Sequence, residues 1–100
     1  HAAQAQQVLD EVAAQDLQLA GRSSDGMPSI RALQQLSRAR QANALRHWLK
    51  DRFHTIPSTA QLSELLDQLA DCTTRGHRIH IKVGLGFVQR SSDVLTWYNP

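Results

Sequence analysis

The sequence predicts an α+β domain in which three to four helices pack against a small antiparallel three-stranded sheet at the C-terminal end. Up to about residue 72, apolar side chains recur at three- and four-residue steps, which is the spacing of helices with one buried side. From about residue 77 they alternate with polar side chains, which is the spacing of half-buried strands. We therefore expect residues 1–100 to form a single domain, with a helical part over about 2–72 and a β-meander over about 77–98.

The first predicted helix covers residues 2–20. One side of it is apolar and is expected to be buried, and its members are Ala5, Val8, Leu9, Val12 and Leu19. Gly21 is expected to end the helix, because glycine readily adopts the left-handed conformation found after many helices. Asp16 lies on or beside the apolar side, either as an acceptor for a basic neighbour or as a structural hydrogen-bond acceptor at its edge.

A predicted loop at residues 22–28, with Ser-Ser-Asp-Gly as turn chemistry, leads to a short element. Ile30, Leu33 and Leu36 predict a helical turn there, although Ser29 and Ile30 also fit a brief strand.

A pair of helices at the centre organises the chain. Ser37 is a good N-cap for the first, which is predicted to run to Phe53. Ser58 and Gln61 have the spacing of a capping box, so the second is predicted to begin at residue 59 and to end near residue 72. Only residues 54–58 connect them, so the helices should pack as neighbours. The expected core residues are Leu45, Trp48, Leu49, Leu62, Leu65, Leu66 and Leu69.

The other side of the first central helix is polar and largely basic. At about 100° per residue it is roughly opposite the apolar side, and we expect it to form an outward basic stripe. Its members are Arg40, Asn43, Arg46, His47 and Lys50.

The last quarter of the chain predicts three strands joined by tight turns. The first has a buried face and a basic face, because Ile79, Ile81 and Val83 alternate with Arg78, His80 and Lys82. Residues 84–86 are a predicted turn, residues 87–90 a second strand, residues 91–93 another turn and residues 94–98 a third strand. Leu95 and Trp97 are expected to share one face of the third strand.

Composition excludes several classes of protein. Of the 100 residues, 41% are hydrophobic and 20% charged, which is typical of globular domains. No apolar stretch approaches the roughly 20 residues that a membrane-spanning helix needs, so no membrane partner is expected. Cys72 is the single cysteine, which fits a reducing, cytoplasmic compartment. The chain starts at His1 inside a helical pattern, and we interpret it as a fragment of a longer enzyme, with a processed mature chain as the alternative.

The formal net charge of +2 is unevenly distributed along the chain. Residues 37–53 hold five basic residues against one acid, and residues 75–100 hold four against one. Residues 54–74 hold three acids and no lysine or arginine. Two local basic surfaces on a nearly neutral body suit an auxiliary contact with a polyanion, and the alternative is that they are ordinary solvated surfaces.

No motif predicts a catalytic, nucleotide-binding or metal site. Gly84-Leu85-Gly86 begins like a phosphate loop, but Gln89 stands where a third glycine is needed, so a hairpin turn is expected. Cys72, His77 and His80 match no zinc spacing and lack a fourth ligand. We expect Cys72 to be a buried thiol rather than a nucleophile, and we expect no metal or cofactor in this chain.

Helices followed by a β-hairpin are also the element order of a winged-helix DNA-binding domain. Residues 59–72 would then be the recognition helix, but they include Glu64, Asp67 and Asp71 and no basic residue. Phosphates would repel such a helix, and it offers no arginine to a guanine edge. A winged-helix-like DNA binder is therefore a disfavoured alternative.

The central residues resemble a known family. The pattern is Ser37-x-Ala39-Arg40-x-x-Asn43-x-Leu45-Arg46-x-Trp48-Leu49, followed by Ile56-Pro57-Ser58-x-x-x-Leu62-x-x-Leu65-x-x-x-Leu69. It is preceded by Leu9-Asp10-Glu11 and Asp16-Leu17 and followed by the Gly84-x-Gly86 hairpin and an aromatic terminal strand. In these features the chain is similar, over nearly its whole length, to the substrate-binding domain of bacterial tRNA(Ile)-lysidine synthetase (TilS, once called the cell-cycle protein MesJ).

The resemblance implies a role in tRNA modification. Full enzymes of that family use ATP and Mg²⁺ in an N-terminal PP-loop domain to adenylate the wobble cytidine of isoleucine tRNA with a CAU anticodon, and then attach lysine. No PP-loop motif occurs in this sequence, so the resemblance implies a non-catalytic domain that binds this tRNA beside the PP-loop domain of its own chain.

Five basic residues are the candidate phosphate contacts. Arg40, Arg46 and Lys50 come first and Arg78 and Lys82 second, because arginine pairs with phosphate bidentately and lysine supplies a point charge. The alternative from a different functional class is a spacer or protein-interaction domain that docks on a catalytic domain and contacts no RNA.

Overall fold

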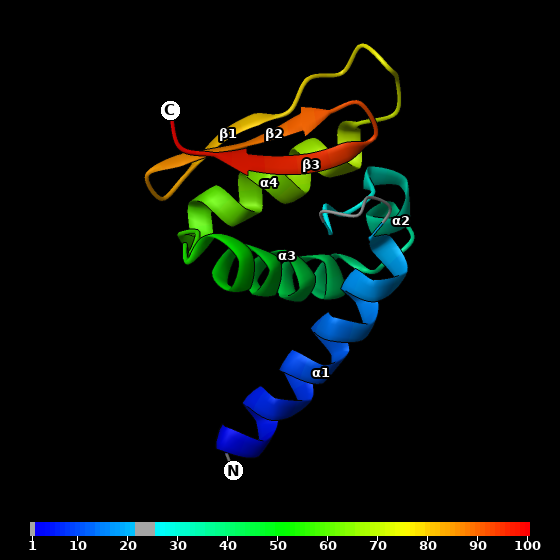
Figure 1. Cartoon of the computed structure of the whole chain (residues 1–100). Helices are drawn as coiled ribbons and strands as arrows, with labels where there is room; N and C mark the ends of the chain where they lie inside the picture. The colour runs from blue at the N-terminus through cyan, green and yellow to red at the C-terminus, as the bar shows by residue number, and fades with distance from the viewer. Residues whose placement is uncertain (1, 22–25) are drawn as a thin grey trace.

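The computed structural model describes residues 2–21 and 26–100, so part of the predicted loop at 22–28 lies outside the described residues. Four helices precede three strands within these ranges (Figure 1). The elements are α1 (Ala2–Ala20), α2 (Ile30–Gln34), α3 (Arg38–Phe53), α4 (Thr59–Asp71), β1 (His80–Val83), β2 (Gly86–Ser91) and β3 (Val94–Tyr98). The predicted α+β class is confirmed.

The strands form an antiparallel meander in the order β1-β2-β3. Ile81, Val88 and Trp97 lie opposite one another across the three strands and face the helices, where Ile81 and Val88 are buried. All four helices lie on this side of the sheet in Figure 1, with α4 directly beneath it and α3 below α4. The other face of the sheet is left uncovered by the described helices.

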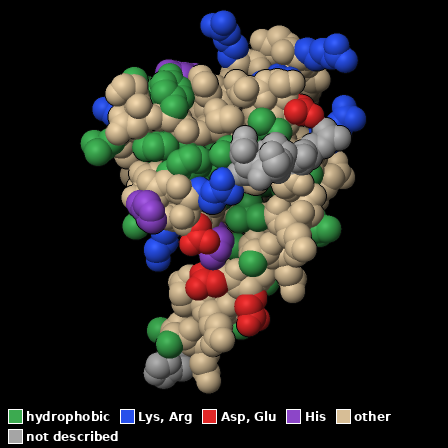
Figure 2. Space-filling view, viewed as in Figure 1, with side chains coloured by type: hydrophobic (Ala, Val, Ile, Leu, Met, Phe, Trp, Pro, Cys, Tyr) green, Lys and Arg blue, Asp and Glu red, His purple; other side chains and the backbone are tan. Residues whose placement is uncertain are grey.

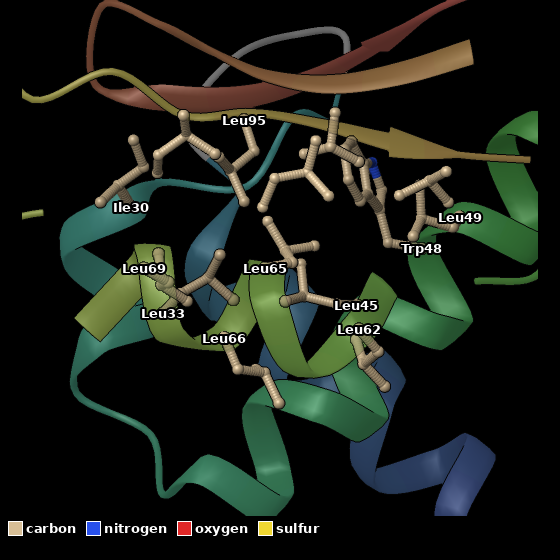
Figure 3. Packing of buried hydrophobic residues seen from close by; sticks show 14 of the residues in the cluster. Ile30, Leu33, Leu45, Trp48, Leu49, Leu62, Leu65, Leu66, Leu69 and Leu95 are labelled. Carbon is tan, nitrogen blue, oxygen red and sulfur yellow. The ribbon is translucent and has the colours of Figure 1, made fainter. Parts of the chain in front are cut away.

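The hydrophobic core lies between the sheet and the helices α2, α3 and α4 (Figure 3). Trp48 and Leu65 are at most 1% exposed, and burying side chains of this size stabilises the fold by roughly 1.5–3 kcal/mol each. The seven core residues expected from the sequence are all buried. The other members of the cluster are Ala20, Ile30, Leu33, Cys72, Ile79, Ile81, Val83, Val88 and Leu95.

The central helices begin and end where the sequence predicts. The hydroxyl of Ser37 accepts a hydrogen bond from the backbone N–H of Arg40, which caps α3. Ser58 and Gln61 form the reciprocal capping box at the start of α4. His54 ends α3 in the left-handed conformation (φ 52°), and its N–H donates to the carbonyl of Lys50.

Two glutamine side chains satisfy carbonyls at the ends of short helices. Gln41 is buried and donates to the carbonyls of Leu33, in the last turn of α2, and of Leu36, just beyond that helix. Gln34 donates to the carbonyls of Leu69 and Cys72 at the end of α4. Because carbonyls at helix ends have no partner within the helix, these amides also fix how the helices meet.

Both predictions for residues 29 and 30 are found together. Ser29 caps the short helix α2 through a hydrogen bond from the N–H of Ala32. It also forms an isolated β-bridge with Val94, and the N–H of Ile30 donates to the carbonyl of Asp93. The segment therefore ties the start of α2 to the edge strand β3.

The buried side of α1 differs from the one that the sequence predicts. Val8, Leu9 and Leu19 are 57%, 46% and 81% exposed, so their predicted burial is wrong. The first half of α1 projects away from the body of the domain (Figure 1), and Ala5 there is exposed as well. Val12 is half-buried, and the fully buried residues of the helix are Ala13, Asp16 and Ala20. The fully buried residues of α1 are therefore two alanines and Asp16, and the carboxylate of Asp16 accepts hydrogen bonds from Arg40 of α3.

Candidate nucleic-acid interface

The polar side of α3 is partly covered by α1. The side-chain amide of Asn43 donates to the carbonyl of Leu9 (2.9 Å), and Nδ1 of His47 lies 3.7 Å from the carboxylate of Asp10. The prediction of a fully outward basic stripe is therefore wrong at these positions. Arg40, Asn43 and His47 of the stripe instead contact α1.

Arg40 makes the strongest of these contacts. Its Nε donates to Oδ2 of Asp16 at 3.1 Å, and a terminal nitrogen donates to Oδ1 of the same carboxylate. The Asp16 side chain is 0% exposed, while that of Arg40 is 52% exposed. Hydrogen bonding to Asp16 and its negative charge raise the pKa of Arg40 above its ordinary value. Of the two interpretations of Asp16, acceptor for a basic neighbour is confirmed, while the phosphate contact predicted for Arg40 stays a prediction.

Arg46 and Lys50 are exposed at the next two turns of α3 and line an open groove between α3 and α1. Neither side chain makes a hydrogen bond or ion pair with a residue in the described part of the chain. The groove also holds two carboxylates, Asp10 and Asp51, with His47 between them. These acids reduce the positive potential that the two cations present to an approaching polyanion.

Arg78 and Lys82 lie on the other basic surface, at the sheet. Lys82 points to the uncovered face of β1, and Arg78 lines an open groove with Arg75 and His80 beside the same face. Within the residues that the structure describes, neither Arg78 nor Lys82 is ion-paired. In the view of Figure 2, Lys and Arg side chains gather around the end that holds the sheet, and most Asp and Glu side chains lie toward α1.

Arg90 also lines this groove, but its guanidinium donates to the connection that precedes β1 and to the turn between β2 and β3. Its terminal Nη1 donates to the carbonyls of Thr74 (2.7 Å) and His77 (2.8 Å) and lies 3.3 Å from Sγ of Cys72. Its Nε donates to the carbonyl of Ser92 at 2.7 Å. Arg90 therefore orders the backbone that carries Arg78, and it is not a free cation.

The structure places Cys72, His77 and His80 in three separate contacts. Cys72 is buried, Nε2 of His77 lies 3.0 Å from the amide oxygen of Gln68, and Nε2 of His80 lies 2.8 Å from the hydroxyl of Tyr98. Across residues 2–21 and 26–100, no three histidine, cysteine, aspartate or glutamate side chains form a group that would hold a metal ion. None of the helices in those ranges combines the length and hydropathy required to cross a bilayer.

Two aromatic residues beside Lys82 were not among the residues predicted for the site. Phe87 and Tyr98 lie on the same uncovered face of the sheet as Lys82, directly opposite it on the next two strands. Their alternation with buried residues was visible, but their alignment depends on the pairing register of the strands.

Comparison with known proteins identifies the family. The sequence profile described as the TilS substrate binding domain matches residues 29–96, from the N-cap of α2 into β3. The chain belongs to this family. The resemblance inferred from the motif around α3 and α4 is thereby confirmed.

Several tRNA(Ile)-lysidine synthases are relatives of this TilS-family chain. That of Polaromonas naphthalenivorans (strain CJ2) is 62% identical over 90 residues, which are 90% of this chain and 26% of that protein. That of Bordetella parapertussis (strain 12822) is 40% identical over 85 residues, covering 80% of this chain and 24% of that protein. The chain thus spans about a quarter of the length of these relatives. No solved structure matches it.

Proposed function

We propose that this domain is the non-catalytic tRNA-binding part of a tRNA(Ile)-lysidine synthase, with isoleucine tRNA carrying a CAU anticodon as its RNA partner. Membership of the TilS substrate-binding family and the names of the relatives support this proposal. The observation that carries it is that four of the five candidate cations are exposed and have no ion-pair partner among the described residues. They are Arg46 and Lys50 on α3, and Arg78 and Lys82 at the sheet.

The proposal extends to the protein of which this domain is a part. A PP-loop domain of the same chain would use ATP and Mg²⁺ to attach lysine to the wobble cytidine of the bound tRNA, in the bacterial cytoplasm. We assign no cofactor to the domain itself, because Gly84 and Gly86 flank a hairpin turn between β1 and β2 instead of preceding a helix. Its contribution to the reaction is to hold the tRNA.

Electrostatics within the domain favour the sheet over α3 as the principal RNA contact. No acidic residue occurs from Cys72 to Ser92 or after Asp93, so Arg78 and Lys82 lie in a part of the chain that has no carboxylate side chain near them in sequence. Arg46 and Lys50 share their groove with Asp10 and Asp51. We therefore rank Arg78 and Lys82 ahead of Arg40, Arg46 and Lys50 as phosphate contacts, which reverses the order that residue type alone suggests.

A salt titration of the chain binding isoleucine tRNA with a CAU anticodon tests the proposal, with a DNA duplex of unrelated sequence as the comparison. Each phosphate contact steepens the loss of affinity with salt by about one power of the salt concentration. We expect weak binding that falls with salt and exceeds the signal from the duplex. Equal binding to both nucleic acids, or to neither, would contradict a tRNA-binding role for the domain.

The winged-helix alternative loses further support from the surroundings of α4. Leu62, Leu65, Leu66 and Leu69 bury one side of α4 in the core. The exposed side carries Glu64, Asp67 and Asp71, and Asp67 is paired with Arg38 of α3 at 2.8 Å. A recognition helix of this charge would repel the phosphates on either side of a DNA groove.

A docking role is the second candidate function, and one observation favours it. The projecting half of α1 exposes Val8 and Leu9, with Ala5 one turn earlier on the same side. A helix side of this kind usually packs on a partner, and the PP-loop domain of the same chain is the proposed one. Val8→Ser with Leu9→Ser should weaken association with the separately produced PP-loop domain and leave the salt slope of tRNA binding unchanged.

A further inference from the structure

The uncovered face of the sheet carries a row of side chains that crosses all three strands. Lys82 of β1 pairs in register with Phe87 of β2, and Phe87 pairs with Tyr98 of β3. Residues at directly opposed positions project from the same face and lie within contact distance. The next row on this face consists of His80, Gln89 and Thr96.

Three rings from these rows form one aromatic surface. His80 stacks on Phe87 with ring centroids 4.5 Å apart and planes at 13°, and Phe87 lies 5.7 Å from Tyr98. Nε2 of His80 is 2.8 Å from the Tyr98 hydroxyl, which closes the group. His80 and Tyr98 are exposed and Phe87 is half-buried, so the rings keep accessible surface on the side away from the helices.

Positive charge borders this aromatic surface on two sides. Lys82 occupies one end of the Phe87 row, and the groove lined by Arg75 and Arg78 continues from His80 and Gln89. Strands β1, β2 and β3 contain no aspartate or glutamate. A neutral apolar peptide would gain nothing from these cations, whereas a polyanion with flat aromatic groups would use both features.

We propose that the uncovered face of the sheet binds an unpaired nucleotide of RNA. The base stacks on the surface formed by His80, Phe87 and Tyr98, and the flanking phosphates contact Lys82 and Arg78. Gln89, beside the rings, offers an amide donor and acceptor to the edge of the base. This inference rests on the proposed tRNA-binding function and narrows it, because bases within a duplex are already stacked and are not available to such a surface.

The test compares variants of the chain binding a short single-stranded RNA that contains the fluorescent base 2-aminopurine, with a duplex RNA of the same length as a second probe. Tyr98→Leu should weaken single-strand binding by about 5- to 100-fold, the range for losing one base–aromatic stack. It should leave the salt slope unchanged, while Lys82→Ala should lower that slope by about one. Tyr98→Phe keeps the ring and should retain most of the affinity.

Leu19→Ala is the matched control, because it removes an 81% exposed apolar side chain from α1 and should change neither probe. A second measurement uses the unmodified chain. Binding should quench the fluorescence of the 2-aminopurine in the RNA. It should also shift the ring-proton NMR signals of His80 and Phe87. This measurement does not depend on any variant folding.

Two results overturn the inference without affecting the proposed function. One is full affinity for single-stranded RNA in folded Tyr98→Leu, and the other is tRNA binding that leaves the His80 and Phe87 signals unmoved. Either result would mean that the aromatic surface binds a protein partner and that cations elsewhere in the domain bind the tRNA. If the unmodified chain binds neither tRNA nor single-stranded RNA, both proposals are overturned together.

Discussion

Arg40 in α3 and Asp16 in α1 form a two-bonded ion pair whose carboxylate is fully buried and whose guanidinium is half exposed. The pair joins positions 24 residues apart and helps to fix which side of α1 is buried. Arg40→Ala should lower the melting temperature by several degrees, because Asp16 would remain buried without its cation. Circular dichroism measures this, and the double variant Asp16→Leu/Arg40→Met should recover most of the loss. An unchanged melting temperature for Arg40→Ala would contradict the structural role.

The same pair makes a prediction for pH. Asp16 raises the pKa of Arg40 in the folded state, so folding binds the arginine proton more tightly. That contribution is fully present below the ordinary pKa of arginine and is lost only as the pH rises through the raised value. The difference in melting temperature between the unmodified chain and Arg40→Ala should therefore stay constant from about pH 7 to about pH 10. A difference that shrinks within this range would show that another titrating group controls the contact.

The capping box of α4 should contribute measurably to stability. In Ser58→Ala, the N–H of Gln61 loses its acceptor, while the backbone N–H of residue 58 still donates to the glutamine side chain. The free energy of unfolding should fall by about 1 kcal/mol, measured by urea denaturation. Ser63→Ala is the matched control, because Ser63 is exposed within the same helix. If both variants lose the same free energy of unfolding, Ser58 has no special role at the cap.

Gly86 should tolerate no side chain. A Cβ there would overlap the carbonyl oxygen of Tyr98 and the ring of Trp97, which is held in place by a hydrogen bond from its Nε1 to the carbonyl of Val83 (3.0 Å). Gly86→Ala should cost about 1–3 kcal/mol of unfolding free energy, as overpacking in a core does. Gly76→Ala provides the comparison, because a Cβ at Gly76 meets no atom within 4 Å. Equal stability of the two variants would contradict the close approach at Gly86.

The two basic surfaces should differ in their effect on tRNA binding. Arg78→Ala with Lys82→Ala should lower the salt slope of tRNA binding by about two, and Arg46→Ala with Lys50→Ala by less. Anisotropy titrations with isoleucine tRNA measure both. Arg38→Ala removes an arginine that is already paired with Asp67 and serves as the control for the loss of one positive charge outside the two surfaces. In the full enzyme, Arg46→Ala should leave the affinity for ATP unchanged. If the Arg46/Lys50 variant lowers the salt slope of tRNA binding more than the Arg78/Lys82 variant does, the α3 residues are the principal phosphate contacts.

The sequence predicted the elements well because their ends depend on local chemistry. Ser37, Ser58 and the 54–58 connection act within a few residues of themselves, so α3 and α4 lie where those residues indicate. The core side of α4 followed from the same kind of reasoning, because a stripe of four leucines leaves one orientation open.

Two features depend on contacts between distant parts of the chain and were not predictable in this way. The apolar pattern of α1 suggests burial of Val8 and Leu9, but the buried residues of this helix are Ala13, Asp16 and Ala20. The surface around Phe87 arises from strand register, and a shift by one residue would turn Phe87 toward the core. For the five candidate cations, residue type indicated the charge, and only the fold shows that Arg40 already has a partner.

Arg90 has a consequence for the connection between the helices and the sheet. Its guanidinium gathers the carbonyl oxygens of Thr74, His77 and Ser92 around a single positive charge, an arrangement that many loops achieve with a bound calcium ion. A permanent charge of the chain itself therefore holds the connection and the turn between β2 and β3 together. Lysine would not replace it, because only the planar guanidinium reaches these acceptors from fixed directions.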